Sequence, residues 1–337
     1  MNVKQNVNIN VKNNVNNVRL YGMLYKISKK NWHRYCIYKN RTRHRIKRGR
    51  KKEGLPQQKT IGGRYKKGDN MNILVCIKQV PDTTSIKIDP VRNTLIRDGV
   101  PSIVNPFDGY ALEAAARIKD KDPETKIVVM SMGPEQAKNA LKECLAIAAD
   151  KAYLVSGRKF GGSDTLATSF IISEAIKMVE EKEGCKFDAI FCGKQAIDGD
   201  TGQVGPEIAE YYGYPQVTYG LEAEAADGML KVKKETEEGA EIIGIRTPCV
   251  VTFTKPSFDP RFPTIKRRMA ANRAEIPVIS DSDLVLDETR IGLKGSPTKV
   301  KKTFVPQKKQ GGMKIKEGTY ADSAKKLFTV LNDAGVI

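Results

Sequence analysis

The chain has 337 residues, of which 40% are hydrophobic and 29% charged, and a formal net charge of +19. This length and hydrophobic content are typical of a globular protein with one large domain or two. Its apolar runs are well short of the ~18 to 20 residues that a membrane-spanning helix needs, so we expect no membrane insertion.

The positive charge is concentrated in residues 1–70. This segment holds 20 of the 58 Lys and Arg residues but only two acidic residues, Glu53 and Asp69, so its net charge is +18. Residues 71–337 hold 38 basic and 37 acidic residues. Because this larger part is nearly neutral, it gives no electrostatic reason to expect nucleic-acid binding.

Residues 1–70 have two interpretations. The Asn-rich start and the basic block RTRHRIKRGRKK (Arg41–Lys52) are compatible with an RNA-binding or targeting arm. Against this, the segment has neither an amphipathic Ser-rich helix nor an apolar signal-peptide core. We expect a disordered segment or a misassigned start, with translation beginning at Met71, since codons for KKGDN can contain a purine-rich ribosome-binding sequence.

The residue types absent from residues 71–337 exclude several chemistries. Both histidines, His33 and His44, precede Met71, so catalytic triads and histidine-ligated metals are excluded after it. The five cysteines after Met71 are scattered and mostly lie in apolar runs, which predicts reduced thiols in a cytoplasmic protein and no metal site. These cysteines are Cys76, Cys144, Cys185, Cys192 and Cys249.

Residues 71–280 alternate short apolar runs with helical patterns, beginning with a predicted strand at Asn72–Val80. A helix over Pro106–Asp120 follows, with Asn105 as its N-cap and proline at its first position. A strand at Lys126–Gly133 and a helix at Pro134–Ala149 repeat the unit, and KAYLVS, SDTLATSFIISEAIKMVEEKEG and FDAIFCG repeat it again. This order predicts an α/β domain with a doubly wound, mostly parallel sheet.

The pattern changes after Pro215. Alternating runs around Asp227-Gly228 predict an antiparallel hairpin that extends the sheet. Residues 281–337 are turn-rich until a helix at Thr319–Gly335, in which Gly335 is the C-cap. We expect this C-terminal arm to lie on a partner chain, and the alternative is an arm folded back on its own domain.

Four turns should meet at the carboxyl edge of the sheet, where open α/β sheets bind ligands. They are KQVPDTT, VNPFDG, SMGPEQ and GKQAIDGDTGQVGP. Their glycines and the helix N-termini that follow them suit a phosphate. The sequence contains neither GxGxxG nor GxxxxGK[ST], so a nucleotide would be held by another α/β scheme. A well-capped loop without a ligand is the alternative.

The acidic residues of the last turn limit how a nucleotide binds. Asp198 and Asp200 would repel a phosphate, so we expect them at ribose hydroxyls, at a helix cap or at a flavin edge, leaving the phosphates to Thr201, Gly202 and Gln203. In SDTLATS, Thr165 and Thr168 share a helix face and can reach a ligand. That segment can equally be a helix start capped by Ser163 or Asp164.

These motifs resemble the β subunit of electron transfer flavoproteins, and the resemblance runs from Met71 to Ile337. It is carried by NILVCIKQVPD, NPFDGYALEAA, SMGP, GKQAIDGDTGQVGPEIAE and PQVTY. The resemblance implies a heterodimer with an α subunit that carries FAD. The β subunit then holds either a structural AMP or a second FAD that accepts hydride from NADH.

The resemblance favours the electron-bifurcating type for two reasons. DGDTGQVGP lacks the extra residues that ordinary members insert after the aspartates, and the segments SDTLAT and DPRFPT are similar to those of the bifurcating class. This type implies transfer to the α-subunit FAD and to ferredoxin or flavodoxin. The alternative is a conventional β subunit that holds AMP and relays electrons from an acyl-CoA dehydrogenase-type flavoenzyme. Either way the flavin supplies the chemistry and no residue is catalytic by itself.

The resemblance also implies the site residues. The nucleotide-binding residues are Cys76, Asn105, Pro106, Phe107, Asp108, Met132, Gly133, Asp164, Thr165, Thr168, Gly193, Lys194, Gln195, Ala196, Ile197, Asp198, Gly199, Asp200, Thr201, Gly202, Gln203 and Val204. The proline-stiffened loop that begins at Lys255 is either a solvated loop or a docking loop. The resemblance favours docking through Lys255, Pro256, Pro260, Arg261, Pro263 and Thr264.

Overall fold

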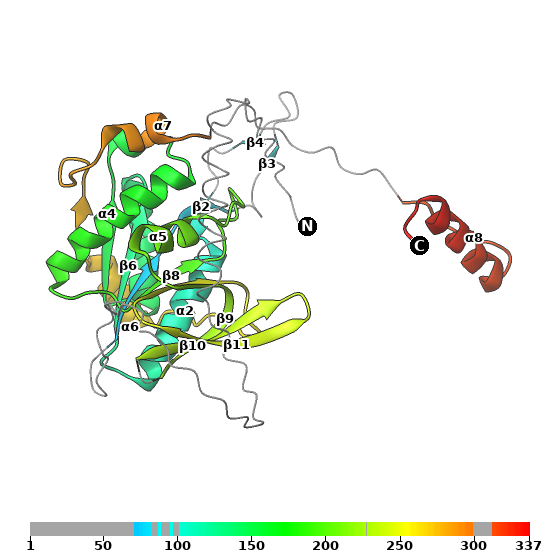
Figure 1. Cartoon of the computed structure of the whole chain (residues 1–337), viewed down its shortest axis with the longest axis horizontal. Helices are drawn as coiled ribbons and strands as arrows, with labels where there is room; N and C mark the ends of the chain where they lie inside the picture. The colour runs from blue at the N-terminus through cyan, green and yellow to red at the C-terminus, as the bar shows by residue number, and fades with distance from the viewer. Residues whose placement is uncertain (1–70, 83–86, 89–94, 97–100, 227, 299–311) are drawn as a thin grey trace, which may run out of the picture.

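The structure is a computed structural model that describes residues 71–82, 87–88, 95–96, 101–226, 228–298 and 312–337 (Figure 1). The expectations for residues 1–70 lie outside the described residues. In the described part, a large sheet is covered by helices on both faces, as the alternation of strand and helix patterns predicts.

The central sheet has nine strands in the order β11-β10-β9-β12-β8-β1-β6-β7-β13. All neighbouring strands from β9 to β13 are parallel, and β10 and β11 are antiparallel additions. The doubly wound, mostly parallel sheet is therefore confirmed. The parallel strands are β1 (Asn72–Cys76), β6 (Lys126–Met132), β7 (Lys151–Val155), β8 (Ala189–Gly193), β12 (Cys249–Phe253) and β13 (Val278–Ile279).

Two layers of helices cover the two faces. The helices α2 (Pro106–Lys121) and α3 (Lys138–Ile147) pack on one face, and α4 (Thr165–Glu183) and α5 (Val204–Tyr212) pack on the other. Successive strand residues point to opposite faces of the sheet. Ile73 and Val75 pack in the core with α2 and α3, and Leu74 packs in the core with α4 and α5. The strands are apolar throughout because both of their faces are buried.

The chain changes direction at β1. It first adds β6 and β7 on one side of β1, and then returns to add β8 on the other side. The connections that leave β1 and β8 therefore diverge at the carboxyl ends of these strands. In open α/β sheets this switch point is where ligands bind.

The antiparallel extension is larger than the predicted hairpin. It is a three-stranded meander of β9 (Gln216–Ala226), β10 (Met229–Thr236) and β11 (Gly239–Arg246). Of the predicted turn, Gly228 has a φ of +74°, which favours glycine, and Asp227 lies outside the described residues. Because β9 also pairs with β12 in parallel, the extension continues the central sheet.

Short elements complete the fold. Small antiparallel pairs form between β2 (Gln79–Pro81) and β5 (Ser102–Val104), and between β3 (Lys87–Ile88) and β4 (Leu95–Ile96). The sequence patterns did not predict these pairs, and the single strand predicted at Asn72–Val80 is wrong, since the structure divides it into β1 and the start of β2. The remaining helical elements are η1 (Glu135–Ala137), η2 (Arg158–Phe160), α6 (Ile265–Arg273), η3 (Glu288–Arg290), α7 (Gly292–Gly295) and α8 (Tyr320–Asp333).

The two described parts of the C-terminal region differ. Residues 281–298 lie on the domain, since Leu284 and Ile291 join the core beneath α4. The predicted terminal helix is confirmed as α8, whose N-cap is Thr319, with Gly335 at a φ of +65° after its end. Figure 1 shows α8 apart from the sheet, and Leu327 and Phe328 on it are exposed. The contact of α8 with a partner stays a prediction.

At the amino edge of the sheet, Glu183 is the centre of a buried charge cluster. Its side chain is fully buried and contacts Lys126, Lys151 and the hydroxyl of Tyr153. Burial opposes ionisation of Glu183, but the hydrogen bonds from these three side chains outweigh it and lower its pKa to about 2.

We predict that Glu183→Gln lowers the unfolding free energy by ~1 to 3 kcal/mol at pH 7, because it weakens the charge-assisted hydrogen bonds from Lys126 and Tyr153. A carboxyl group with a lowered folded-state pKa contributes stability above its unfolded pKa and loses it as the pH falls. The difference between wild type and variant should therefore shrink between pH 6 and pH 3. Urea unfolding at several pH values measures this, with Glu181→Gln on the exposed face of α4 as control. A constant difference would contradict the prediction.

Candidate functional site

The expected turns meet at the carboxyl edge of the sheet. Cys76, Met132 and Gly193 end the neighbouring strands β1, β6 and β8, and α2 begins beside them. Cys76 and Met132 pack on the α4/α5 face. The residues assigned to the nucleotide site by the resemblance are thus brought together at the switch point, while the assigned docking residues lie elsewhere.

A buried carboxylate, Asp108, joins three of these turns. It lies in the first turn of α2 and is 6% exposed. One oxygen accepts a hydrogen bond from the backbone N–H of Lys78 after β1 (2.7 Å), and the other accepts one from the N–H of Gly193 (3.1 Å). Burial raises the pKa of Asp108 to about 7, against the two N–H donors, which favour the charged form.

Asn105 holds the loop that follows β8. The residue stands at the N-cap position of α2, as predicted, but its side chain makes no capping hydrogen bond. Instead its Nδ2 donates to the carbonyl of Gln195 (2.8 Å), and its Oδ1 accepts from the N–H of Ile197 (3.2 Å). The side chain is 1% exposed, so the loop is fixed from beneath by a buried amide.

The two aspartates of the loop are both paired within the protein. Asp198 accepts hydrogen bonds from Lys78 Nζ (2.7 and 2.9 Å), and Asp200 accepts one from Gln195 Nε2 (2.8 Å). Asp200 has a φ of +54°, an unusual value for a residue other than glycine. Gln203, and neither aspartate, is the N-cap of α5, so the capping role considered for the aspartates is wrong.

The rest of the loop is open to solvent or turned aside. Thr201 is exposed, and Gly202 takes a φ of +65° that suits glycine. Lys194 extends away from the loop, with its Nζ 4.9 Å from the centre of the Tyr219 ring. The backbone between Gly199 and Gln203 is therefore the part of the loop that a ligand can approach.

The start of α4 approaches the same loop. Asp164 is the N-cap, accepting from the N–H of Ala167, which decides between the two predicted caps. Thr165 Oγ1 lies 3.1 Å from Gln203 Oε1 and 3.2 Å from Glu207 Oε1. Burial raises the pKa of Glu207, and its Oε2 has no hydrogen-bond partner among the described residues. A buried acceptor without a partner is expected where a ligand completes a site.

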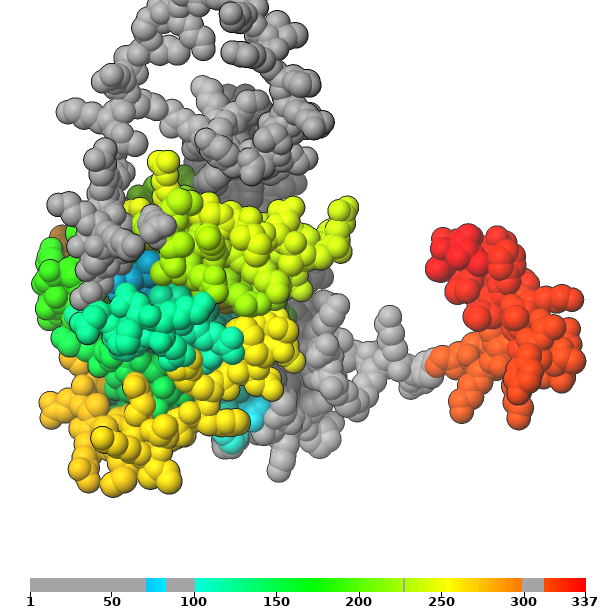
Figure 2. Space-filling view, turned by 90° about the horizontal axis from the view of Figure 1, so that it is seen from below, coloured from blue at the N-terminus to red at the C-terminus, as the bar shows by residue number. Residues whose placement is uncertain are grey.

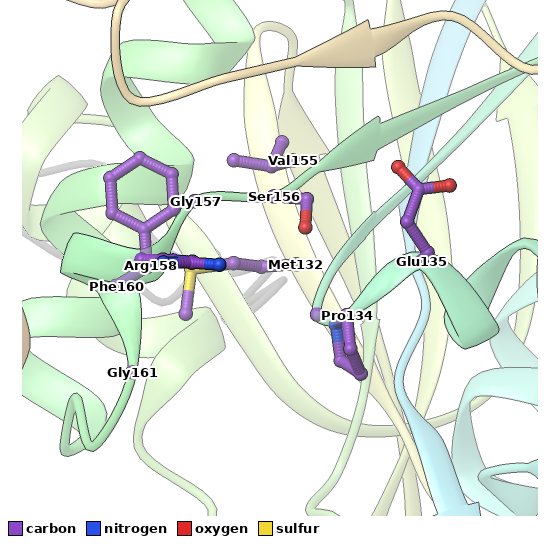
Figure 3. Close-up of a pocket in the computed structure, with 10 residues that line it drawn as sticks. Met132, Pro134, Glu135, Val155, Ser156, Gly157, Arg158, Phe160 and Gly161 are labelled. Carbon is purple, nitrogen blue, oxygen red and sulfur yellow. The ribbon is translucent and has the colours of Figure 1, made fainter.

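A pocket of about 530 Å³ lies on the same edge of the sheet, at the ends of β6 and β7 (Figure 3). Figure 3 shows Met132, Arg158 and Phe160 grouped on one side and Glu135 on the other, with Ser156 between them. Met132 and Gly133 belong to both the pocket and the predicted nucleotide site. The two turns that line the pocket are rich in glycine, which lets a ligand approach their backbone.

The predicted docking loop is anchored on α2, away from this pocket. Arg261 donates to Glu113, which is 3% exposed, and to Asp120 on α2. Arg117 on α2 lies 3.3 Å from the centre of the Phe258 ring. Arg261 therefore holds the loop on the domain, and the residue beside it, Phe262, is 90% exposed. Figure 2 shows this yellow-to-gold segment beside the green-blue surface of α2.

The other assigned docking residues differ in exposure. Lys255 is exposed, Pro256 is buried, and Pro260 and Pro263 are half-buried. Thr264 caps α6 by accepting from the N–H of Arg267. Ile265 (81% exposed) and Met269 (53%) continue the apolar surface of Phe262 along α6.

Several residues of the site were not predicted from the sequence. Lys78 stands in a turn that the patterns singled out, but nothing marked its contact with Asp198. Glu207 has the ordinary signature of an acidic residue in a first helical turn. The signal for the pocket was the glycine-rich segment SGRKFGG (157, 161 and 162 are glycine), which follows β7 as SMGP follows β6.

We predict that Asp108→Asn removes a pH dependence of stability, because the amide cannot ionise whereas the buried carboxyl group can. The folded-state pKa of Asp108 is raised from 3.8 to about 7, so its contribution to stability falls as the pH rises through this range. The stability advantage of wild type over the variant should therefore shrink by ~2 kcal/mol between pH 5 and pH 8. Urea unfolding measures it, with exposed Asp259→Asn as control. Parallel pH profiles would refute this role of Asp108.

No helix in the described part of the chain is long and apolar enough to cross a membrane. No group of three or more described His, Cys, Asp or Glu residues is arranged to hold a metal ion.

The model of the electron transfer flavoprotein domain matches residues 92–284. The electron transfer flavoprotein subunit beta of Megasphaera elsdenii is 52% identical over 247 residues, which is 73% of this chain and 92% of that protein. The same subunit of Thermoanaerobacterium thermosaccharolyticum is 48% identical (79% and 100%). Subunit CarD of the caffeyl-CoA reductase-Etf complex of Acetobacterium woodii is 45% identical (79% and 100%).

The match covers more than half of the chain, and these relatives are aligned over most of their own length. The chain therefore belongs to the electron transfer flavoprotein family, among its β subunits.

Proposed function

We propose that the chain is the β subunit of a heterodimeric electron-bifurcating flavoprotein and holds FAD at the carboxyl edge of its sheet. The observation that carries this proposal is the pocket at the ends of β6 and β7, which lies on the same edge of the sheet as the loop after β8 and shares Met132 and Gly133 with the predicted nucleotide site. A mononucleotide on that loop would leave the pocket of about 530 Å³ empty, whereas FAD has a further ring system to place there.

The residues of this edge suit a dinucleotide in three parts. The backbone of Gly199–Gln203 and the N-termini of α4 and α5 are suited to the phosphates. Thr165 and the unpaired Oε2 of Glu207 offer hydrogen bonds between loop and pocket. In the pocket, Phe160 and Met132 offer apolar surface, and Arg158 offers a cation.

When bound, the flavin would accept hydride from NADH and pass one electron to the α-subunit FAD and the other to ferredoxin or flavodoxin. The contribution of this chain is to bind and orient the cofactor and to set its electrostatic surroundings. This division of roles agrees with the absence of histidine from residues 71–337.

The alternative is a conventional β subunit that holds AMP and relays electrons from an acyl-CoA dehydrogenase-type flavoenzyme. The observation in its favour is that the loop after β8 is already fixed by Asn105, Lys78 and Asp108 without any contribution from the pocket. The nucleic-acid-binding alternative concerns residues 1–70, which lie outside the described residues.

The number of FAD molecules per heterodimer separates the two proposals. We predict two FAD and no AMP when the chain is co-expressed with its α subunit, denatured and analysed by liquid chromatography. Ser156→Trp should fill the pocket and remove one FAD, while Glu181→Trp, on an exposed part of α4, should retain both. One FAD and one AMP in the wild type would contradict the bifurcating proposal and support the conventional one.

We further propose that the loop 255–264 and α6 dock an electron-transfer partner through Phe262, Ile265 and Met269. These side chains are exposed and adjacent along the chain, and the Arg261 ion pairs hold the loop rigid. A rigid exposed aromatic residue loses little entropy on binding. The name of the CarD relative, which belongs to a caffeyl-CoA reductase-Etf complex, supports a partner that acts on acyl-CoA compounds.

Phe262→Ala should leave the unfolding free energy within ~0.5 kcal/mol of wild type, since the side chain is almost fully exposed. It should reduce the rate of electron transfer to the partner dehydrogenase by ~10-fold or more. Arg261→Ala should lower both stability and transfer, because it breaks the contacts with Glu113. Stopped-flow reduction of the partner and urea unfolding measure the two effects. Unchanged transfer in Phe262→Ala would exclude this docking surface.

A further inference from the structure

Two cysteines lie side by side beneath the loop of the candidate site. The parallel strands β1 and β8 pair Ile73 with Ala189, Leu74 with Ile190 and Val75 with Phe191. The next residues in this register are Cys76 and Cys192. Neighbouring strands lie ~4.8 Å apart, which is within the ~4.4 to 6.8 Å between Cα atoms that a disulfide spans.

Both side chains point to the same face of the sheet, toward α4 and α5. The side chains of Cys76 and Cys192 are therefore neighbours across the two strands. The neighbouring Cys76 thiol and burial raise the pKa of Cys192 well above its ordinary value. Both cysteines are free.

The two thiols differ in access to solvent. Cys192 is 5% exposed, whereas Cys76 is half-buried at the end of its strand. The other described cysteines have different surroundings: Cys144 and Cys249 belong to the core on the opposite face, and Cys185 follows α4 near the amino edge of the sheet. Among the described cysteines, Cys76 therefore combines access for an oxidant with a thiol neighbour.

We propose that Cys76 and Cys192 form a reversible disulfide that controls how tightly the site retains its nucleotide. With hydrogen peroxide as oxidant, the Cys76 thiolate attacks one peroxide oxygen, the O–O bond breaks, and a sulfenic acid and hydroxide form. The Cys192 sulfur then attacks the sulfenic sulfur, the S–S bond forms, and water leaves with the thiol proton. Two thiols and one peroxide give one disulfide and two waters, and a dithiol reductant reverses the reaction.

The position of the pair explains why its oxidation would affect the site. Disulfides most often span ~5.5 to 6 Å between Cα atoms, which is more than the ~4.8 Å between neighbouring strands, so forming the bond strains the ends of β1 and β8. Lys78 follows Cys76 by two residues, and Gly193 follows Cys192 directly; both N–H groups are held by Asp108. A shift of the strand ends on oxidation would therefore move the two turns that form the candidate site.

The first turn of α5 is also in contact with the pair. A Cβ atom added at Gly205 would lie 3.4 Å from Cys192 Cβ and 3.6 Å from its Sγ. The start of α5 therefore packs close to Cys192, with only a glycine at the point of approach. The effect on nucleotide retention rests on the proposed function, whereas the disulfide itself does not.

The disulfide is tested on the purified full chain. After treatment with a small excess of hydrogen peroxide, free thiols are blocked with N-ethylmaleimide in denaturant and the protein is digested. We expect a linked peptide pair that joins Cys76 to Cys192, two fewer maleimide labels than in the reduced chain, and full reversal by dithiothreitol. Cys185→Ser should still form the link, and Cys192→Ser should not. Full labelling of both cysteines after oxidation would overturn the proposal.

The effect on the site is tested by calorimetric titration of the same samples with FAD and with AMP. We expect the dissociation constant of at least one nucleotide to rise ~10-fold or more on oxidation and to recover on reduction. In Cys192→Ser, peroxide treatment should leave the constant unchanged relative to the untreated variant. A disulfide without a change in affinity would refute the control of retention. If neither nucleotide binds the reduced chain in its complex with the α subunit, the proposed function fails, while peptide mapping still decides whether the disulfide forms.

Discussion

The candidate site depends on one buried carboxylate. Asp108 accepts the N–H of Lys78 with one oxygen and the N–H of Gly193 with the other, so a side chain of α2 fixes the two turns that diverge at the switch point. The last hydrogen bonds to a neighbouring strand of the central sheet are those of Ile77 with Met130 and of Lys194 with Phe253, and neither of them joins the two turns to each other. The carboxylate therefore holds the two turns in fixed positions beyond the carboxyl ends of their strands.

This arrangement explains why residue 193 must be glycine. A Cβ atom there would lie 2.3 Å from Asp108 Oδ1 and 2.8 Å from the backbone N of the same residue. The carboxylate can reach the N–H only because no side chain stands between them. The same close approach carries an electrostatic cost, visible in the raised pKa of Asp108, which two N–H donors only partly offset.

The sequence predicts the architecture because the fold depends on patterns that extend over many residues. Apolar strands followed by capped helices appear three times, and each becomes a βα unit of the sheet. Contacts between residues far apart in the chain have no such pattern. The side chain of Asn105 bonds with residues 90 and 92 positions away, so its real role is hidden behind an ordinary N-cap signature. Arg261 was predicted to dock a partner, but its side chain donates a hydrogen bond to Glu113, 148 positions away, and the neighbouring Phe262 is the exposed residue.

The two edges of the sheet show why these local contacts differ in kind. At the amino edge, carboxylates accept the N–H groups at or just before the strand starts: Asp188 binds Asn72, Asp150 binds Ile127, and Glu180 binds Phe187. These groups are satisfied within the chain, and the edge is closed.

At the carboxyl edge, Glu207 Oε2 has no partner among the described residues, and a non-glycine residue, Asp200, takes a positive φ. Both features carry a free-energy cost that the fold itself does not require. Because the amino edge is closed so completely, the chain can tolerate an open and strained carboxyl edge, and a ligand bound there would satisfy the acceptor that folding leaves unpaired.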